Sequence, residues 1–136
     1  MTKYLRNEAD PKSTQLRKGI LELAIMTVLA RQAHYGYSLV RSLTRAGELD
    51  LKEGTIYPIL ARMAKEGLVA SEWVESNQGP PRKYYRLTTA GRIAWESLDR
   101  EFRRLVHLVG QAGRESAGED DPETMKPISF RRDDHE

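Results

Sequence analysis

The side chains in this sequence that are best suited to bind a ligand are cations and hydroxyls gathered in two stretches. In the first, Gly54, Thr55 and Tyr57 stand near the start of an amphipathic segment. In the second, Arg82 and Lys83 follow a turn-rich run, and no acidic residue occurs from position 76 to position 95. Guanidinium, ammonium and hydroxyl groups are common partners of phosphate oxygens. The residue types therefore indicate phosphate recognition.

The sequence contains few groups that could support catalysis. It has no cysteine, which excludes disulfides, thiolate metal sites and thiol nucleophiles. The histidines at positions 34, 107 and 135 have no paired spacing for a metal, no nucleophile lies in a recognised elbow, and there is no Gly-rich phosphate loop. We therefore expect neither an enzyme nor a metal or cofactor site.

Net charge differs between the two parts of the chain. Residues 1–92 contain 15 Lys and Arg against 9 Asp and Glu, a net charge of +6, whereas residues 93–136 contain 7 against 11, a net charge of −4. This split is typical of a phosphate-binding module with a solvating tail, and uneven surface charge without a partner is the alternative. No apolar run is long enough to span a membrane and no signal-like region follows the N-terminus, so we expect a cytoplasmic protein.

The first predicted helix covers residues 13–33. Its wide apolar stripe is typical of a central helix, and Ser13 or Thr14 could serve as its N-cap. Arg17 and Lys18 lie near its start, where phosphate contact and a solvated basic turn are both open interpretations.

Two further helices are predicted at residues 36–46, which expose Arg41, and at residues 53–68, which bury Ile56 and Leu60 and end at Gly67. Two short helices with a brief connection favour a helix-turn-helix. The outward face of the second, which begins with Thr55 and Tyr57 and continues through Arg62 and Lys65, could enter a DNA major groove. An ordinary amphipathic surface helix is the alternative. Pro58 is acceptable if it falls in the first helical turn.

After Gly67 the sequence predicts an antiparallel hairpin. The β-prone stretches are residues 69–75 and 83–87, and the turn-rich residues 76–82 form a long tip. A basic hairpin beside a helix-turn-helix is a wing, which contacts phosphates or the minor groove through residues such as Arg82 and Lys83. A solvated hairpin is the alternative.

A last helix is predicted from Thr88, its N-cap, to residue 113. Apolar residues recur along it at spacings of three and four, which favours pairing with a second subunit over covering the chain's own domain; the seam comprises Trp95, Leu98, Phe102, Leu105, Val109 and Ala112. The polar, acidic composition of residues 114–136 predicts a disordered tail.

Four segments of the chain resemble the PadR family of bacterial transcriptional regulators: Tyr35-Gly36-Tyr37, residues 54–60, residues 66–69 and residues 79–88. The resemblance runs from about residue 13 to residue 109. It implies a winged helix-turn-helix followed by a dimerising C-terminal helix, and a homodimer on a pseudo-palindromic operator. Such regulators usually repress a nearby gene and are often released by a small molecule. With one C-terminal helix, the chain is similar to the shorter branch of the family.

By this resemblance, the recognition element would include Tyr37, Gly54, Thr55 and Tyr57, and the wing would include Arg82 and Lys83. Ile56 stands where many members carry leucine, which is a conservative change. In some relatives, aromatic residues of the dimerising helix line a pore between subunits. Trp95 and Phe102 could therefore bind a planar aromatic or cationic effector, and a plain dimer core is the alternative.

The expected organisation is a mainly α chain with a small antiparallel β-hairpin. It consists of an N-terminal arm (1–12), a winged helix-turn-helix domain (13–87), a dimerisation helix (88–113) and an acidic tail (114–136). We expect a sequence-specific regulator that binds double-stranded operator DNA as a homodimer, with phosphate contacts from Arg17, Lys18, Arg41, Arg82 and Lys83. The alternative is a winged-helix module that binds protein, which would not need a basic wing.

Overall fold

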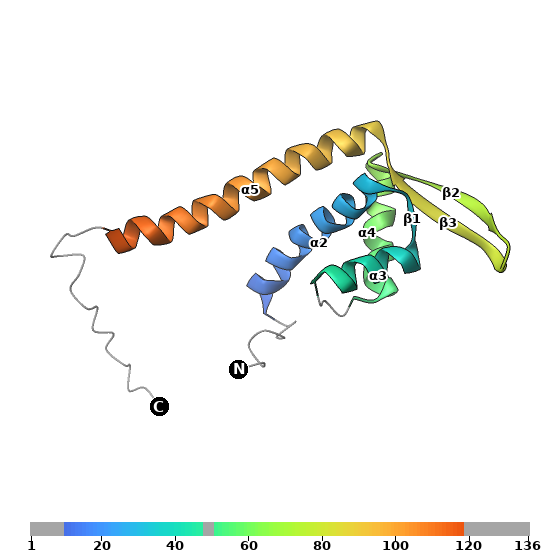
Figure 1. Ribbon diagram of the computed structural model, residues 1–136, viewed down its shortest axis with the longest axis horizontal. Helices are drawn as coiled ribbons and strands as arrows, with labels where there is room; N and C mark the ends of the chain where they lie inside the picture. The colour runs from blue at the N-terminus through green and yellow to red at the C-terminus, as the bar shows by residue number, and fades with distance from the viewer. Residues whose placement is uncertain (1–9, 48–50, 119–136) are drawn as a thin grey trace, which may run out of the picture. The chain divides into compact units, whose positions relative to one another are not determined.

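The computed structural model describes residues 10–47 and 51–118, so the predicted arm lies mostly outside the described residues, as does most of the predicted tail. It is mainly α with a small antiparallel sheet, which confirms the predicted fold class (Figure 1). The chain divides into two units, one ending at Arg100 and the other starting at Glu101. The elements, in order, are α2 (Pro11–Arg31), β1 (His34–Tyr35), α3 (Gly36–Gly47), α4 (Glu53–Lys65), β2 (Val69–Ser76), β3 (Gly79–Leu87) and α5 (Thr89–Gly118).

The core of the first unit lies among α2, α3, α4 and the base of the sheet. Side chains from all three helices are fully buried there, among them Ile25, Leu39, Ile56, Leu60 and Met63. The apolar stripe of α2 is buried only from Leu23 to Leu29, while Leu16 and Ile20 nearer its start are exposed. Thr27, also on the predicted stripe, is exposed, and the buried side is formed mainly by Ile25, Met26 and Leu29. The helical spacing therefore predicted the helix but not the side of it that the domain covers.

The start of α2 differs from the prediction. Asp10 is the N-cap, and its carboxylate accepts a hydrogen bond of 3.1 Å from the Lys12 backbone N–H, so neither Ser13 nor Thr14 caps the helix. Pro11 occupies the first helical position, where a missing N–H costs no helical hydrogen bond.

The end of α4 has the predicted terminating glycine, Gly67, directly after the C-cap residue Glu66. Gly67 has a φ of +75°, its N–H bonds Ala64 O at 3.1 Å, and Leu68 N–H bonds Met63 O at 2.9 Å. This pair of bonds satisfies the last carbonyls of the helix and requires a residue that tolerates a positive φ.

Pro58 is the sixth residue of α4, beyond the first turn in which it was expected. Its missing N–H leaves the Gly54 carbonyl without a helical donor. Gly54 is exposed, so water can supply the missing hydrogen bond and the helix continues past the proline.

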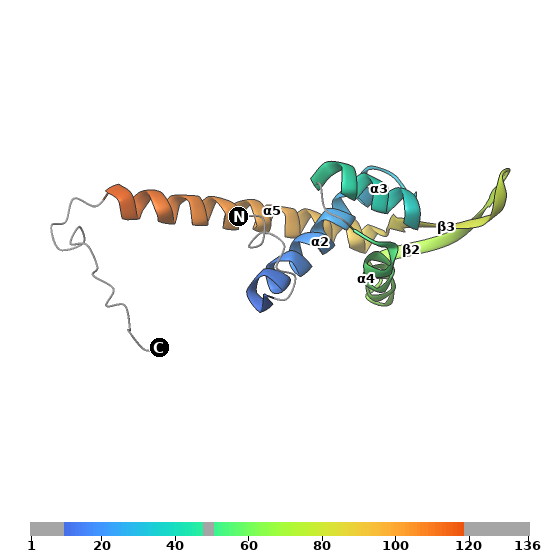
Figure 2. The same ribbon diagram turned by 90° about the horizontal axis from the view of Figure 1, so that it is seen from below.

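The sheet has the strand order β1-β3-β2, and both pairings are antiparallel. The wing has a tip of two residues, Asn77 and Gln78, instead of the predicted long tip, because β3 already begins at Gly79. The two-residue strand β1 was not predicted, since so short a segment has no periodicity. In Figures 1 and 2 the hairpin β2–β3 extends past α3 and α4.

Helix α5 begins as predicted, with the Thr88 hydroxyl accepting a bond of 2.9 Å from Gly91 N–H, and continues past residue 113 to Gly118. Two hydrogen bonds join its first turns to α2. The Trp95 indole donates to Thr27 Oγ1 at 3.1 Å, and Arg92 donates to Ala30 O at 3.2 Å. Within the described residues, no helix has both the length and the apolar character needed to cross a bilayer.

Candidate nucleic-acid interface

The start of α3, the start of α4 and the hairpin meet at one end of the first unit. Together they form a hollow of about 370 Å³, called here the aromatic–basic hollow. Four residues singled out in the sequence lie in it, namely Tyr37, Tyr57, Arg82 and Lys83. Its other lining residues are Tyr35, Trp73, Pro81 and Tyr85.

The two wing cations are positioned by aromatic rings. The Arg82 guanidinium carbon lies 4.5 Å from the centroid of the Tyr35 ring. Lys83 Nζ lies 5.9 Å from the Trp73 centroid and 5.8 Å from the Tyr85 centroid. Such contacts hold a cation without neutralising its charge. Both cations are exposed and can therefore bind an anion outside the protein.

The start of α3 adds a third cation to this surface. Tyr37 is 52% exposed, and the Arg41 guanidinium one turn later lies 5.8 Å from its ring centroid. Tyr37 also stacks on Tyr35, with the ring centroids 6.4 Å apart. The Tyr37 ring therefore connects Arg41 with the residues that hold Arg82.

Tyr57 reaches toward α3 instead of pointing straight outward from α4. A Cβ at Gly36 would overlap the Tyr57 hydroxyl, so the two residues are in close contact. Burial, followed by the negative charge of Glu53, raises the pKa of Tyr57, and burial followed by the charge of Tyr57 raises the pKa of Tyr85. Both phenols are thus neutral hydrogen-bond donors at pH 7. Tyr57 connects α4 to α3, in addition to lining the hollow.

The outward side of α4 carries mostly short side chains. Its exposed residues include Gly54, Thr55, Pro58, Ala61 and Lys65. Such a surface lets the helix backbone come close to a partner and offers few long groups that could read bases. Arg62, predicted to belong to this side, donates to Glu22 Oε2 at 2.9 Å and ties α4 to α2.

Arg17 and Lys18 are not brought together with the aromatic–basic hollow. They lie in the first half of α2, where their side chains are exposed. In Figures 1 and 2 the deep-blue start of α2 and the hairpin are at opposite ends of the first unit. These two cations form a separate basic surface.

Two residues near these elements were not predicted from the sequence as candidates: Lys52, at the start of α4, and Trp73, in the aromatic–basic hollow. Lys52 is the N-cap residue of α4 and is exposed, next to Thr55, whose N–H bonds Lys52 O at 3.0 Å. Its position directly before Glu53, the first residue of the predicted helix, could have indicated an exposed cation at the start of that helix. Trp73 joins the hollow only because it pairs with Lys83 across the hairpin, and sequence alone does not define that register.

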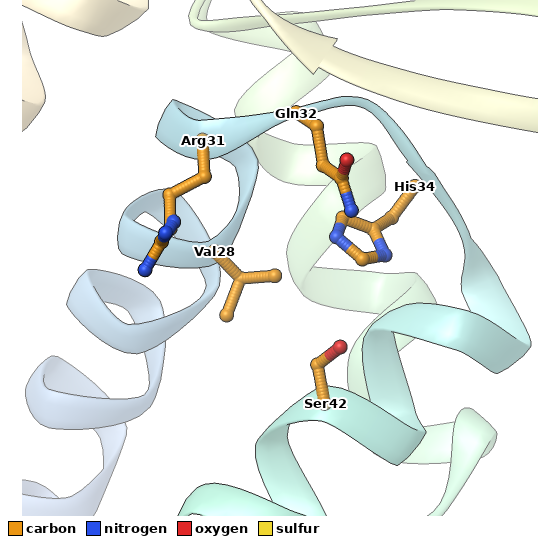
Figure 3. Close-up of a pocket in the computed structure, with 5 residues that line it drawn as sticks. All are labelled: Val28, Arg31, Gln32, His34 and Ser42. Atoms are coloured by element: carbon orange, nitrogen blue, oxygen red, sulfur yellow. The ribbon is translucent and has the colours of Figure 1, made fainter.

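A second hollow of about 440 Å³ lies between α2 and α3, lined by Val28, Arg31, Gln32, His34 and Ser42 (Figure 3). His34 Nδ1 and Ser38 Oγ are 2.8 Å apart, and Ser38 donates to Tyr35 O at 3.0 Å. Ser38 has no second proton, so His34 donates to it and is not placed as its general base. Burial lowers the pKa of His34, so the imidazole is neutral at pH 7.

Three helices with a hairpin beside the last of them define a winged helix-turn-helix DNA-binding domain. The profile of the transcriptional regulator PadR-like family matches residues 25–97, and the chain belongs to this family. Members of the family are transcriptional regulators and not enzymes.

Named relatives agree with this assignment. A transcriptional regulator of Mycobacterium tuberculosis H37Rv is 31% identical over 76% of this chain and 95% of its own length. A PadR-like transcription factor from Bacteroides fragilis is 40% identical, with a TM-score of 0.66 over 76% of this chain and 99% of that one. A PadR-like regulator from Bacillus cereus is 35% identical, with a TM-score of 0.66 over 72% and 95%.

Proposed function

We propose that this PadR-family regulator is a cytoplasmic, homodimeric repressor that binds a pseudo-palindromic operator through α4 and the aromatic–basic hollow. The observation that carries the proposal is that Arg82 and Lys83 line the hollow from the two sides of the wing, next to the start of α4, and that Arg41 adjoins it through the Tyr37 ring. Three cations held by aromatic rings suit the closely spaced phosphates of a duplex.

The proposed contacts divide into two kinds. Arg41, Arg82 and Lys83 neutralise phosphates, which gives affinity with a strong salt dependence. Gly54, Thr55 and Tyr37 lie closest to the base edges, with the short side chains of α4 allowing close approach and with specificity drawn partly from DNA shape. Phosphate contacts by Arg17 and Lys18 remain predictions, and binding through the aromatic–basic hollow does not require them.

Dimerisation is proposed through α5. Leu98, Phe102, Leu105 and Val109 follow one side of the helix and are 40%, 36%, 43% and 72% exposed. A row of large apolar side chains on one helix side is stable in water when another helix covers it, and a second copy of α5 fits by symmetry. Trp95, at the start of this row, already packs on α2 and would join the interface only with its remaining exposed edge.

The proposal includes release by a planar aromatic or cationic effector that stacks on Phe102 and the exposed edge of Trp95. Titration of tryptophan fluorescence with such compounds should then give saturable quenching and lower DNA affinity at the same concentrations. If no planar aromatic or cationic compound quenches the tryptophan fluorescence, the protein has no such effector site and the seam is a plain dimer core.

A gel-shift experiment on DNA from the protein's own promoter tests the central statement. A retarded complex that unlabelled random DNA does not displace supports operator binding. If neither this fragment nor any duplex selected from a random pool is retained, the surface serves a protein partner instead.

A further inference from the structure

Trp73 is a large aromatic residue of the hairpin, and its side chain is exposed to solvent. It lies in the middle of β2 and is 69% exposed, whereas Tyr85, on the same side of the sheet, is 7% exposed. Neither the core nor the dimer seam uses this ring: the core ends at Val69, Tyr85 and Leu87, and the seam lies on α5.

The hairpin register fixes the direction of the ring. Trp73 is paired directly with Lys83, Ser71 with Tyr85, and Val69 with Leu87, so these residues share one side of the sheet. Val69, Tyr85 and Leu87 are buried, so this is the side that faces the helices. Trp73 continues that side past the end of the core.

The surroundings of the ring indicate what can cover it. Lys83 Nζ lies 5.9 Å from its centroid, and the ring lines the aromatic–basic hollow with Arg82. A partner on this side has to offer negative charge for Lys83 and an apolar surface for the indole. The backbone of duplex DNA offers both, since phosphates alternate with the carbon faces of deoxyribose.

We propose that Trp73 is a DNA contact whose indole packs against deoxyribose beside the phosphate that Lys83 binds. This inference rests on the proposed operator binding and assigns a further residue to it. Its contribution differs in kind from that of the wing cations. Burying an apolar ring releases no counterions, so Trp73 adds affinity without adding to the salt dependence.

The experiment measures operator affinity by fluorescence anisotropy at several salt concentrations, with a duplex selected by the wild-type protein. Trp73→Ala should weaken binding about tenfold at every salt concentration and leave the slope of log K against log salt unchanged. Lys83→Ala should lower that slope by about 1. Trp73→Phe, which keeps an apolar ring, should recover most of the affinity.

Val74→Ala is the matched control, because Val74 is 41% exposed on the opposite side of the same strand, paired with Arg82. Its operator affinity should equal that of the wild type, and circular dichroism should show all variants folded. Operator binding should also change the tryptophan emission of the wild type and much less that of Trp73→Phe.

Wild-type affinity in folded Trp73→Ala would overturn the inference while leaving operator binding intact. A loss accompanied by a smaller salt slope would overturn it too, because the ring would then only position Lys83. If the wild type itself binds no duplex, the proposed function fails, and that result is distinct from either of these.

Discussion

At the scale of single residues, Gly36 is required by a neighbouring side chain. It is the first residue of α3, and the Tyr57 ring lies where its Cβ would be. The glycine of the Tyr-Gly-Tyr segment and the tyrosine of the α4 segment are therefore two halves of one contact between the helices. This contact positions the start of α4 against the start of α3.

Gly36→Ala should destabilise the fold by up to about 1 kcal/mol, because the added methyl group displaces the Tyr57 ring, whose end is 42% exposed and can shift. In a Tyr57→Ala background the same change should cost much less, since the ring is gone. Urea unfolding of the four proteins in this double-mutant cycle measures the difference.

Gly19→Ala in α2 is the control, since a Cβ there meets nothing within 4 Å. It should stabilise the protein by up to about 1 kcal/mol through helix propensity. An equal loss from Gly36→Ala in both backgrounds would show that Tyr57 is not the cause.

At the scale of elements, the hairpin is the part whose charge and shape act together. Arg82 and Lys83 are adjacent in β3 and therefore lie on opposite sides of the sheet, each over an aromatic ring of its own side. The wing thus presents cations on both of its sides, and the two can reach different phosphates.

Replacing Arg82 and Lys83 together by alanine should weaken operator binding about tenfold or more at low salt and lower the salt slope by about 2, since two phosphate contacts are lost. Anisotropy titrations at two or more salt concentrations measure both quantities. Arg114→Ala, which removes a cation from α5, serves as the control and should change neither. Unchanged affinity of the double variant at both salts would exclude the wing from DNA binding.

At the scale of the whole molecule, the proposed dimerisation through the row of exposed apolar residues on α5 would link assembly to DNA binding. Two linked DNA-binding units bind a palindrome far more tightly than one, because the second contact becomes intramolecular. Assembly through α5 would therefore set the half-site spacing of the operator as well as its affinity.

Phe102→Asp should convert the protein from a dimer to a monomer and weaken operator binding about a hundredfold or more, because a carboxylate cannot be buried in an apolar seam without a partner. Analytical ultracentrifugation gives the mass. Ile93→Asp is the control: Ile93 is 64% exposed and lies nine residues from Phe102, on the opposite side of α5. A dimeric Phe102→Asp protein would show that the subunits meet elsewhere.

Local sequence signals predicted many of the elements. Helical spacing identified α2, α3 and α4, Gly67 marked the end of α4, and Thr88 marked the start of α5. Each of these features depends on residues within a turn or two of one another. The predicted N-cap of α2 was wrong because an Asp10 N-cap followed by Pro11 at the first helical position starts the helix more favourably than the hydroxyls of Ser13 or Thr14.

The arrangement of the candidate interface was only partly predictable. Tyr37, Tyr57, Arg82 and Lys83 were singled out and do lie together, because they belong to the two helices of the helix-turn-helix and to the wing that follows them. The part played by Arg62 in holding α4 to α2 was not predictable, since it depends on Glu22, which lies 40 residues earlier.

By itself, the sequence determined the order of the helices and the hairpin, the basic character of the wing and the apolar seam of α5. All of these are patterns of neighbouring residues that local propensity and burial enforce. Tertiary structure alone decided the contact of Tyr57 with Gly36, the bond from Trp95 to Thr27 and the position of Trp73 beside Lys83. The first two depend on packing between distant helices, and the last depends on strand register, where a shift of one residue would turn Trp73 to the other side of the sheet.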